Sequence, residues 1–227
     1  MKQQFTILFD LDGTLVDTAP DLMRAHNHVM TKFGYPTKST EDIRNLVGKG
    51  AGALIGRSIW GQAKKEFSKV LDAKIKDEMV KEFVNFYGKN IVNESTLVTG
   101  VKDFLIWCKE KKISMGVCTN KQEHLAVDLL KKIGINDFFE YVAGHNTFEY
   151  CKPDPRHLTS VIEILGGDIK KTLMIGDSET DANAAKSAGI PVILLEDGYT
   201  EKNTTEIYHN HLIKDFVGIE KIVLKYL

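Results

Sequence analysis

The chain has 227 residues, 43% of them hydrophobic and 27% charged, which is the composition of an ordinary folded globular protein. Thirty basic against 31 acidic residues leave a net charge of −1, which argues against a nucleic-acid or anionic-membrane surface. No run approaches the roughly 18 apolar residues that a membrane-spanning helix needs, and the N-terminal residues do not resemble a signal peptide. Three cysteines, Cys108, Cys118 and Cys151, fit neither a disulfide framework nor a zinc site. We therefore expect a soluble cytoplasmic protein with neither nucleic-acid nor membrane partners.

Short apolar runs predict the strands of a sheet. Five of them stand out along the chain: Phe5–Phe9, Ile113–Thr119, Tyr141–Ala143, Thr172–Ile175 and Pro191–Leu195. The first, fourth and fifth are almost continuously apolar, as is typical of strands that are buried on both faces.

Helical patterns separate the later runs. Leu125, Leu129 and Ile133 recur at every fourth position before a Gly134 stop, and a second pattern starts at Pro155 and ends in Gly-Gly. The alternation of strands and helices predicts an α/β fold with a Rossmann-like, doubly wound parallel sheet.

The interval after the first strand breaks this alternation. Between residues 17 and 93 there is little β-like sequence, but two long stretches place apolar side chains on one helical face, and a shorter helical piece spans Ala51–Trp60. We expect a small α-helical cap subdomain at residues 17–93, inserted into a core domain of residues 1–16 and 94–227.

Polar residues follow the predicted strands at the edge where parallel sheets bind ligands. The candidates after or near the first, second and fourth strands are Asp10, Asp12, Thr119, Asn120, Lys152, Asp177 and Asp181. Carboxylates without cysteine or histidine partners favour a hard cation, most readily Mg²⁺. A metal and a lysine together attract a phosphoryl group, one carboxylate can act as a nucleophile, and a second can transfer protons. The pattern indicates phosphoryl-transfer chemistry.

The segments that carry these residues resemble the four motifs of the haloacid dehalogenase superfamily of phosphatases. They are, in chain order, "FDLDGTLVD", "VCTN", "CKPDP" and "IGDSETD". The resemblance implies a phosphomonoesterase that works through an aspartyl-phosphate intermediate, with a mobile cap over the substrate.

The resemblance also implies roles for individual residues. Asp10 would be the nucleophile and Asp12 the general acid and base. Thr119, with Asn120 beside it, would bind the phosphoryl group, and Lys152 would balance its charge. Mg²⁺ would be bound by Asp10, by Asp12 through its backbone carbonyl and by Asp177, with Asp181 acting through water or in support.

Within the superfamily the chain is most similar to phosphoglycolate phosphatases, because of the segment "RNLVGKGAGALI" and the "GDSETD" form of the last motif. This implies 2-phosphoglycolate as the substrate and glycolate and phosphate as the products. The loop around Gly48 and Gly50 exposes backbone amides, and we expect Lys49 or Arg44 to meet the substrate's carboxylate.

Each motif also has a purely structural interpretation. "LDGT" is typical of an Asp-Gly hairpin turn, and Ser178 with Asp181 is typical of a capping box at a helix start. Thr119 and Asn120 are suited to cap the next helix, and Lys152 to lie on the surface.

Other functions compete with hydrolysis. A sugar-phosphate mutase, or another small-metabolite phosphatase of the same fold, would use the same core residues. A receiver-type signalling domain also surrounds a phosphorylatable aspartate, but it needs neither the inserted helices nor Asp12. We expect a small phosphorylated metabolite as partner, and a monomer or small homo-oligomer.

Overall fold

A six-stranded sheet lies at the centre of the computed structural model, which describes residues 4–60 and 69–227. All neighbouring strands are parallel, in the order β5-β4-β1-β6-β7-β8. The strands are β1 (Thr6–Phe9), β4 (Ser114–Cys118), β5 (Tyr141–Ala143), β6 (Thr172–Gly176), β7 (Val192–Leu195) and β8 (His211–Ile213). The chain builds one half of the sheet from β1 outward through β4 and β5, and the other half through β6, β7 and β8.

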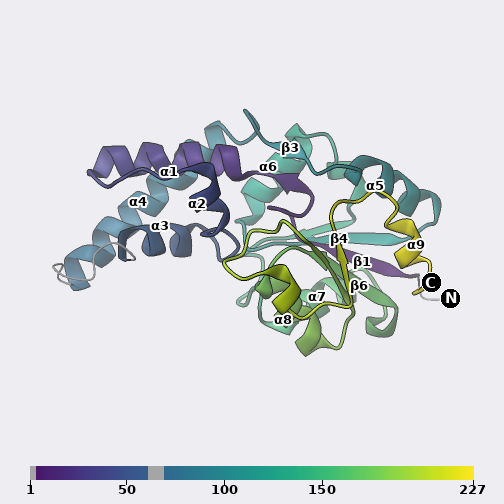
Figure 1. Cartoon of the computed structure of the whole chain (residues 1–227). Coiled ribbons are helices and arrows are strands. Elements are labelled where there is room, and N and C mark those ends of the chain that lie inside the picture. Colours follow the sequence, from purple (N-terminus) through teal and green to yellow (C-terminus); the bar gives the residue numbers. More distant parts are fainter. Residues whose placement is uncertain (1–3, 61–68) are drawn as a thin grey trace.

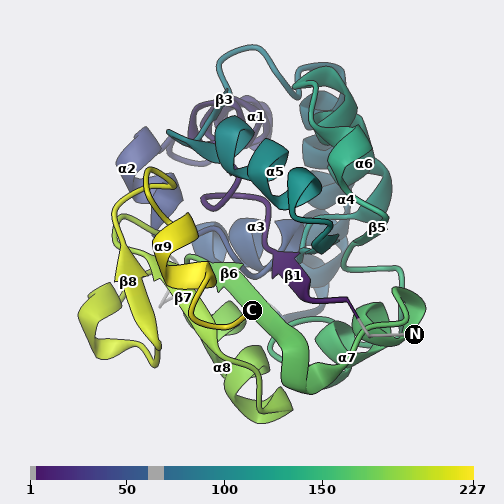
Figure 2. The same ribbon diagram turned by 90° about the vertical axis from the view of Figure 1, so that its right-hand side faces the viewer.

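Both faces of the sheet are covered by helices, as Figures 1 and 2 show. Ile7 and Phe9 pack in one hydrophobic cluster with side chains of α5, α6 and α9, whereas Leu8 packs in a second cluster with side chains of α7 and α8. These helices are α5 (Val101–Glu110), α6 (Glu123–Lys132), α7 (Pro155–Ile164), α8 (Glu179–Ala188) and α9 (Glu220–Val223). The continuous apolar character of β1 follows, because alternate side chains enter two different cores.

Four further helices lie together beside the sheet (Figure 1). They are α1 (Ala19–Phe33), α2 (Thr40–Arg44), α3 (Ala51–Trp60) and α4 (Lys69–Lys89), and α4 packs against both α1 and α3. α1 ends at Gly34, whose φ of +77° is the left-handed conformation that glycine adopts most easily at a helix end. We call α1 to α4 the cap helices.

Two chain passages connect the cap helices to the rest of the molecule, and they pair with each other. Residues Val16–Asp17 (β2) and Thr96–Leu97 (β3) form a two-stranded antiparallel ribbon. Next to it, Asp21 Oδ2 accepts hydrogen bonds from the backbone of residues 93, 94 and 95 at 2.9–3.0 Å and from Ser95 Oγ at 2.7 Å. One buried carboxylate thus ties the start of α1 to the returning chain.

The fold confirms the predicted α/β class with a doubly wound parallel sheet, and each of the five apolar runs overlaps a strand. β2, β3 and β8 were not predicted, because they have only two or three residues and, unlike the equally short β5, do not form an apolar run. The division into a core domain and a cap subdomain at residues 17 and 93 stays a prediction. Across the described residues, no helix combines the length and apolar character needed to cross a bilayer.

Candidate active site

The residues after β1, β4 and β6 lie at one edge of the sheet. Asp10 directly follows β1, Thr119 follows β4, and Asp177 follows β6. Because β1 is paired with both β4 and β6, the side chains after these strands converge. All three are buried, with at most 6% of their surface exposed. The sheet changes direction of growth here, which is where open α/β sheets bind ligands.

Gly13 lets the chain turn sharply behind Asp12. Its φ is +84°, and a Cβ at this position would lie only 2.2 Å from Oδ2 of Asp177. The Gly13 amide donates a hydrogen bond to the Val16 carbonyl at 2.8 Å. "LDGT" does form a turn, but the bridge between Asp12 and Val16 across it is parallel, so it is not the expected hairpin. The turn allows the first motif to approach Asp177 closely.

Three buried carboxylates surround one buried lysine. Lys152 Nζ donates to Asp10 Oδ1 at 2.7 Å and to Asp181 Oδ1 at 2.6 Å, and only 1% of the lysine side chain is exposed. Asp10, Asp177 and Asp181 each offer an oxygen that lies within 4.8 Å of the other two. Lys152 is therefore not a surface residue, and its single charge leaves an excess of buried negative charge.

The electrostatics of this cluster favour a cation. Burial raises the pKa of Asp10 to about 6; the charge of Lys152 opposes this shift and that of Asp181 adds to it. Burial, together with the charges of Asp10 and Asp181, raises the pKa of Asp177 well above its usual range. Burial acts to lower the pKa of Lys152, but Asp10 and Asp181 raise it above its usual value. Buried oxygen ligands with unbalanced negative charge fit a hard divalent ion such as Mg²⁺.

Asp181 has both of its carboxylate oxygens engaged. Oδ1 accepts from Lys152, and Oδ2 accepts from the Ser178 amide at 3.1 Å, from Ser178 Oγ at 2.7 Å and from the Asp177 amide at 3.2 Å. The predicted capping box at the start of α8 is confirmed. The same carboxylate also contacts Lys152. Asp181 can therefore cap α8 and hold Lys152 beside Asp10 at the same time.

Asp12 faces a residue that sequence reasoning missed. Lys121 Nζ lies 2.6 Å from Oδ1 and 2.8 Å from Oδ2 of Asp12, and Thr18 Oγ1 donates to Oδ1 at 2.7 Å. The Lys121 side chain is only 5% exposed. One sequence signal could have identified Lys121: it directly follows Thr119 and Asn120, at the end of a strand where ligands bind.

Thr119 and Asn120 do not cap the next helix. α6 starts at Glu123, with Gln122 before it and no side-chain cap hydrogen bond. Asn120 Nδ2 instead donates to the carbonyls of Gly48 and Lys152, both at 3.0 Å. It thereby joins a loop between cap helices to the backbone of the buried lysine. Asn120 Oδ1 is buried without a hydrogen-bond partner in the described part of the chain.

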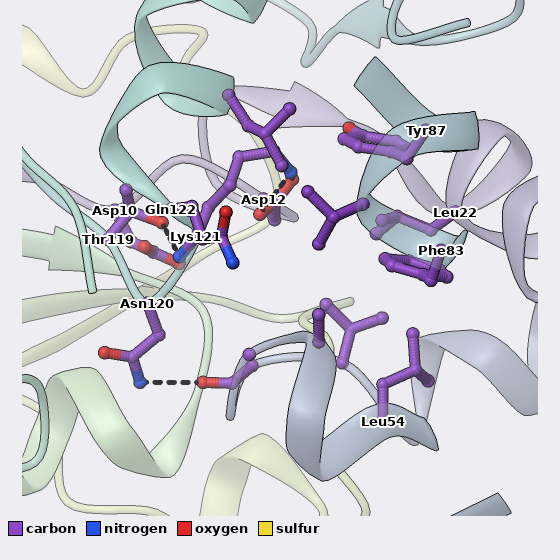
Figure 3. Close-up of a pocket in the computed structure, with 16 residues that line it drawn as sticks. Asp10, Asp12, Leu22, Leu54, Phe83, Tyr87, Thr119, Asn120, Lys121 and Gln122 are labelled. Carbon is purple, nitrogen blue, oxygen red and sulfur yellow. Dashed lines mark hydrogen bonds and ion pairs between the residues drawn. The ribbon is translucent and has the colours of Figure 1, made fainter. Parts of the chain in front are cut away.

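A pocket lies between this edge of the sheet and the cap helices (Figure 3). It holds about 590 Å³ of space, part of which is open to solvent. The sheet side contributes polar side chains: Asp10, Asp12, Thr119, Asn120, Lys121 and Gln122. The cap side contributes mainly apolar ones: Leu22, Val47, Ala51, Leu54, Phe83, Val84 and Tyr87. Among the described residues that line the pocket, Lys121 is the only cation.

Arg44 and Lys49, which we expected at a substrate carboxylate, do not line this pocket. Arg44 Nη2 donates to Asp17 Oδ2 at 2.7 Å, and its guanidinium carbon lies 5.4 Å from the centre of the Tyr199 ring. Lys49 lines a neighbouring recess, although the flanking Gly48 and Gly50 do line the main pocket. Arg44 thus contacts Asp17, and Lys49 lines the neighbouring recess, so a role for either at the substrate's carboxylate stays a prediction.

Tyr199 connects Asp177 to the chain passage at residues 17–19, which leads into the cap helices. No motif in the sequence pointed to Tyr199. Its amide donates to Asp177 Oδ2 at 2.6 Å, while its hydroxyl donates to Asp17 Oδ1 at 2.5 Å and accepts from the Ala19 amide at 2.8 Å. Thr14 Oγ1 donates to the other oxygen of Asp177 at 3.2 Å. These contacts hold the Asp177 carboxylate in one orientation.

Comparisons with known proteins agree with this geometry. The family model described as haloacid dehalogenase-like hydrolase matches residues 7–195. Phosphoglycolate phosphatases from Mesorhizobium japonicum and Caulobacter vibrioides are each 37% identical to the chain. The alignments cover 92% and 98% of this chain and 90% and 92% of those proteins, respectively.

A solved structure from Haemophilus somnus, described as a predicted phosphoglycolate phosphatase, has a TM-score of 0.89 at 31% identity. It covers 98% of this chain and 99% of that one. The chain belongs to the haloacid dehalogenase-like hydrolase family. It is an enzyme that hydrolyses phosphoric monoesters, as the motifs predicted.

Proposed function

We propose that this enzyme is a Mg²⁺-dependent phosphatase of small metabolites, and that its substrate is 2-phosphoglycolate. The observation that supports the chemistry best is the contact of two neighbouring aspartates with different lysines, Asp10 with Lys152 and Asp12 with Lys121. Two carboxylates in such distinct surroundings can divide the roles of nucleophile and proton donor. The names of the 37% identical relatives support the choice of substrate.

Mg²⁺ would be held by Asp10, by Asp177 and by the backbone carbonyl of Asp12. When bound, it supplies positive charge at the phosphoryl oxygens and at the attacking carboxylate. Asp181 would support it indirectly, because both of its oxygens already accept hydrogen bonds from Lys152 and from the start of α8.

In the first step, an oxygen of Asp10 attacks phosphorus, and the bond from phosphorus to the glycolate oxygen breaks. Lys152 fixes the carboxylate through Oδ1 and leaves Oδ2 free to attack. Asp12 gives a proton to the departing glycolate oxygen. Thr119, which lines the pocket, would donate its hydroxyl proton to a phosphoryl oxygen.

In the second step, Asp12 takes a proton from a water molecule, which attacks the phosphorus of the aspartyl-phosphate. The bond to Asp10 breaks, inorganic phosphate leaves, and Asp10 is regenerated as a carboxylate. The apolar side chains of the cap helices limit access of other water while the intermediate exists.

The mechanism assigns different roles to the two proposed parts of the chain. Residues 17–93 act as the cap, and residues 1–16 and 94–227 carry the chemistry. The cysteines are free, and burial raises the pKa of the Cys118 thiol to about 12, which is consistent with a packed thiol in a reducing cytoplasm. The enzyme would act on small phosphorylated metabolites as a monomer or small homo-oligomer.

A substrate panel tests the proposal. Phosphate release is measured with and without Mg²⁺ from 2-phosphoglycolate, glucose phosphates and nucleoside monophosphates. We expect turnover that requires Mg²⁺ and has the highest kcat/KM for 2-phosphoglycolate. Transfer of phosphate between two positions of a sugar, without its release, would establish a mutase instead, and a single stable phosphorylation per chain would establish a receiver.

A further inference from the structure

The pocket needs a partner for the second anionic group of the substrate. The phosphoryl end has Lys152 and the proposed metal, but the rest of the pocket wall is largely apolar. A carboxylate placed there without a hydrogen-bonding or cationic partner would be costly to desolvate. Arg44 and Lys49 do not line this pocket, so Lys121, although it also contacts Asp12, is the only cation on the described wall.

Tyr87 brings an unsatisfied hydroxyl to the same region. It belongs to α4, its side chain lines the pocket, and it is only 1% exposed. Its Oη is buried and has no hydrogen-bond partner within the described residues. Figure 3 shows this oxygen at the end of the ring that faces Asp12 and Lys121. Thr6 and Ser114 also have buried hydroxyls without partners, but neither lines the pocket, whereas Tyr87 does and is suited to a group that enters the pocket.

Lys121 and Tyr87 are adjacent across the boundary between sheet and cap. Lys121 Nζ lies 4.6 Å from the centre of the Tyr87 ring. Burial, together with the nearby charges of Asp12 and Asp21, raises the pKa of Tyr87 well above its usual value, so the hydroxyl keeps its proton and can donate it. One ammonium and one hydroxyl donor thus face the space beside Asp12.

We propose that Lys121 Nζ and Tyr87 Oη together form the subsite that binds the carboxylate of the substrate. This inference rests on the proposed function and extends it to the residues that select the substrate. A carboxylate has two oxygens, and an ammonium group can serve it while still contacting Asp12. The bound substrate satisfies the Tyr87 hydroxyl, whereas an ester without a carboxylate leaves it unpaired. Sites built in this way discriminate strongly against analogues that lack the matching group.

The test compares two esters on the Mg²⁺-loaded enzyme: 2-phosphoglycolate, and ethyl phosphate, which has the same number of carbons but no carboxylate. The quantity is the ratio of their kcat/KM values in wild type, Lys121→Met and Tyr87→Phe. Matched controls are Lys131→Met, an exposed lysine of α6, and Tyr35→Phe, which lies outside the pocket lining.

We expect each subsite variant to lower the preference for 2-phosphoglycolate about 10- to 100-fold, as loss of a hydrogen bond to a charged group implies. The two controls keep the wild-type ratio. Tyr87→Phe removes a single oxygen and does not touch Asp12, so it tests the subsite even if Lys121→Met fails to fold.

Two results overturn the inference in distinguishable ways. If both esters lose activity equally, with an unchanged ratio in either variant, then Lys121 only positions Asp12, or Tyr87 only packs, and the two-residue subsite is wrong. If the wild type shows no preference for 2-phosphoglycolate over ethyl phosphate, the proposed function itself is contradicted, and the subsite is contradicted with it.

Discussion

At Gly13 the conformation of one residue controls how close two motifs can come. The left-handed φ of +84° disfavours any other residue, and the position of a Cβ is already occupied by an Asp177 oxygen. Gly34 has a similar φ of +77°, but nothing lies within 4 Å of the position of its Cβ. A substitution at Gly34 therefore tests the free-energy cost of the left-handed backbone alone, whereas one at Gly13 adds the cost of a steric clash with Asp177.

We predict that Gly34→Ala lowers the free energy of unfolding by about 1 kcal/mol and leaves turnover intact. Gly13→Ala should lower it by about 2–4 kcal/mol, because overpacking adds to the backbone cost, and it should also reduce kcat by displacing Asp177. Urea unfolding and phosphate release measure both effects. Equal losses in the two variants would show that close packing at Gly13 is unimportant.

At this scale, the sequence predicted residues whose position follows from the end of a strand. Asp10, Thr119 and Asp177 were predicted because parallel strands end at a common edge. Tyr87 and Tyr199 reach the site from α4 and from a loop after β7, and their approach depends on tertiary packing that no local pattern encodes. The ion pair between Arg44 and Asp17 was not predicted either, because it joins α2 to the connecting passage through tertiary packing.

At the scale of elements, Asp21 joins α1 to the chain that returns from the cap. Its carboxylate is buried, and a single oxygen accepts four hydrogen bonds from residues 93–95. Burial acts to raise the pKa of Asp21, but these hydrogen bonds outweigh it and lower the pKa below its usual value. The folded state therefore favours the charged form.

We predict that Asp21→Ala lowers the free energy of unfolding by about 2–3 kcal/mol, since buried donors lose their acceptor. Asp77→Ala, on the exposed side of α4, is the matched control and should change it by less than about 0.5 kcal/mol. Urea titration monitored by circular dichroism gives both values. If Asp21→Ala is as stable as Asp77→Ala, the hydrogen bonds of Asp21 to residues 93–95 contribute nothing to the free energy of unfolding.

α7 carries a buried histidine that makes the docking of this helix sensitive to pH. Burial, with a contribution from the charge of Lys152, lowers the pKa of His157 from 6.5 to about 4. The unfolded chain therefore binds a proton at a higher pH than the folded one. The stability associated with neutral His157 is fully present above pH 6.5 and is lost as pH falls from 6.5 toward 4.

We predict that this loss amounts to about 3 kcal/mol between pH 7 and pH 4 and is absent in His157→Gln. The free energy of unfolding of wild type, of this variant and of His124→Gln, an exposed control on α6, is measured across that range. The wild type and the control should lose more stability than His157→Gln. Parallel curves for all three would mean that His157 is protonated equally in both states.

Helices α1, α3, α4, α6 and α7 and the longer buried strands were predictable because each is long enough to show its pattern. Leu125, Leu129 and Ile133 defined α6, and the Pro155 start of α7 was confirmed. The ribbon of β2 and β3 was not predictable, because its two short strands are held by pairing between residues about 80 positions apart.

For the whole molecule, cap and sheet meet through apolar and polar contacts. Leu22 and Leu54 belong to the same hydrophobic cluster as Phe9. Asn120 Nδ2 donates to the Gly48 carbonyl at 3.0 Å, and Arg57 Nη1 donates to Glu201 Oε1 at 2.7 Å. Exposed ion pairs such as that of Arg57 contribute little to stability, so we expect this pair to resist opening of the proposed cap only weakly.

We predict that metal binding at the acid cluster stabilises the whole chain. Mg²⁺ at a hundred times its Kd should raise the free energy of unfolding by about 3 kcal/mol and should raise Tm accordingly. Asp177→Asn removes a proposed ligand and should abolish the shift, whereas Asp128→Asn, on the outer side of α6, should retain it. An unchanged Mg²⁺ response in Asp177→Asn would place the metal elsewhere.

In the proposed mechanism Asp10 becomes phosphorylated during turnover, and trapping that intermediate tests the mechanism. The enzyme is mixed with 2-phosphoglycolate and Mg²⁺ and quenched in acid within one turnover, and its peptides are then analysed by mass spectrometry, with Asp10→Asn as the control. We expect one phosphoryl group on Asp10 in the wild type, together with continuing phosphate release, and neither in the variant. Phosphate release without a phosphorylated Asp10, or undiminished release by Asp10→Asn, would contradict the proposed mechanism.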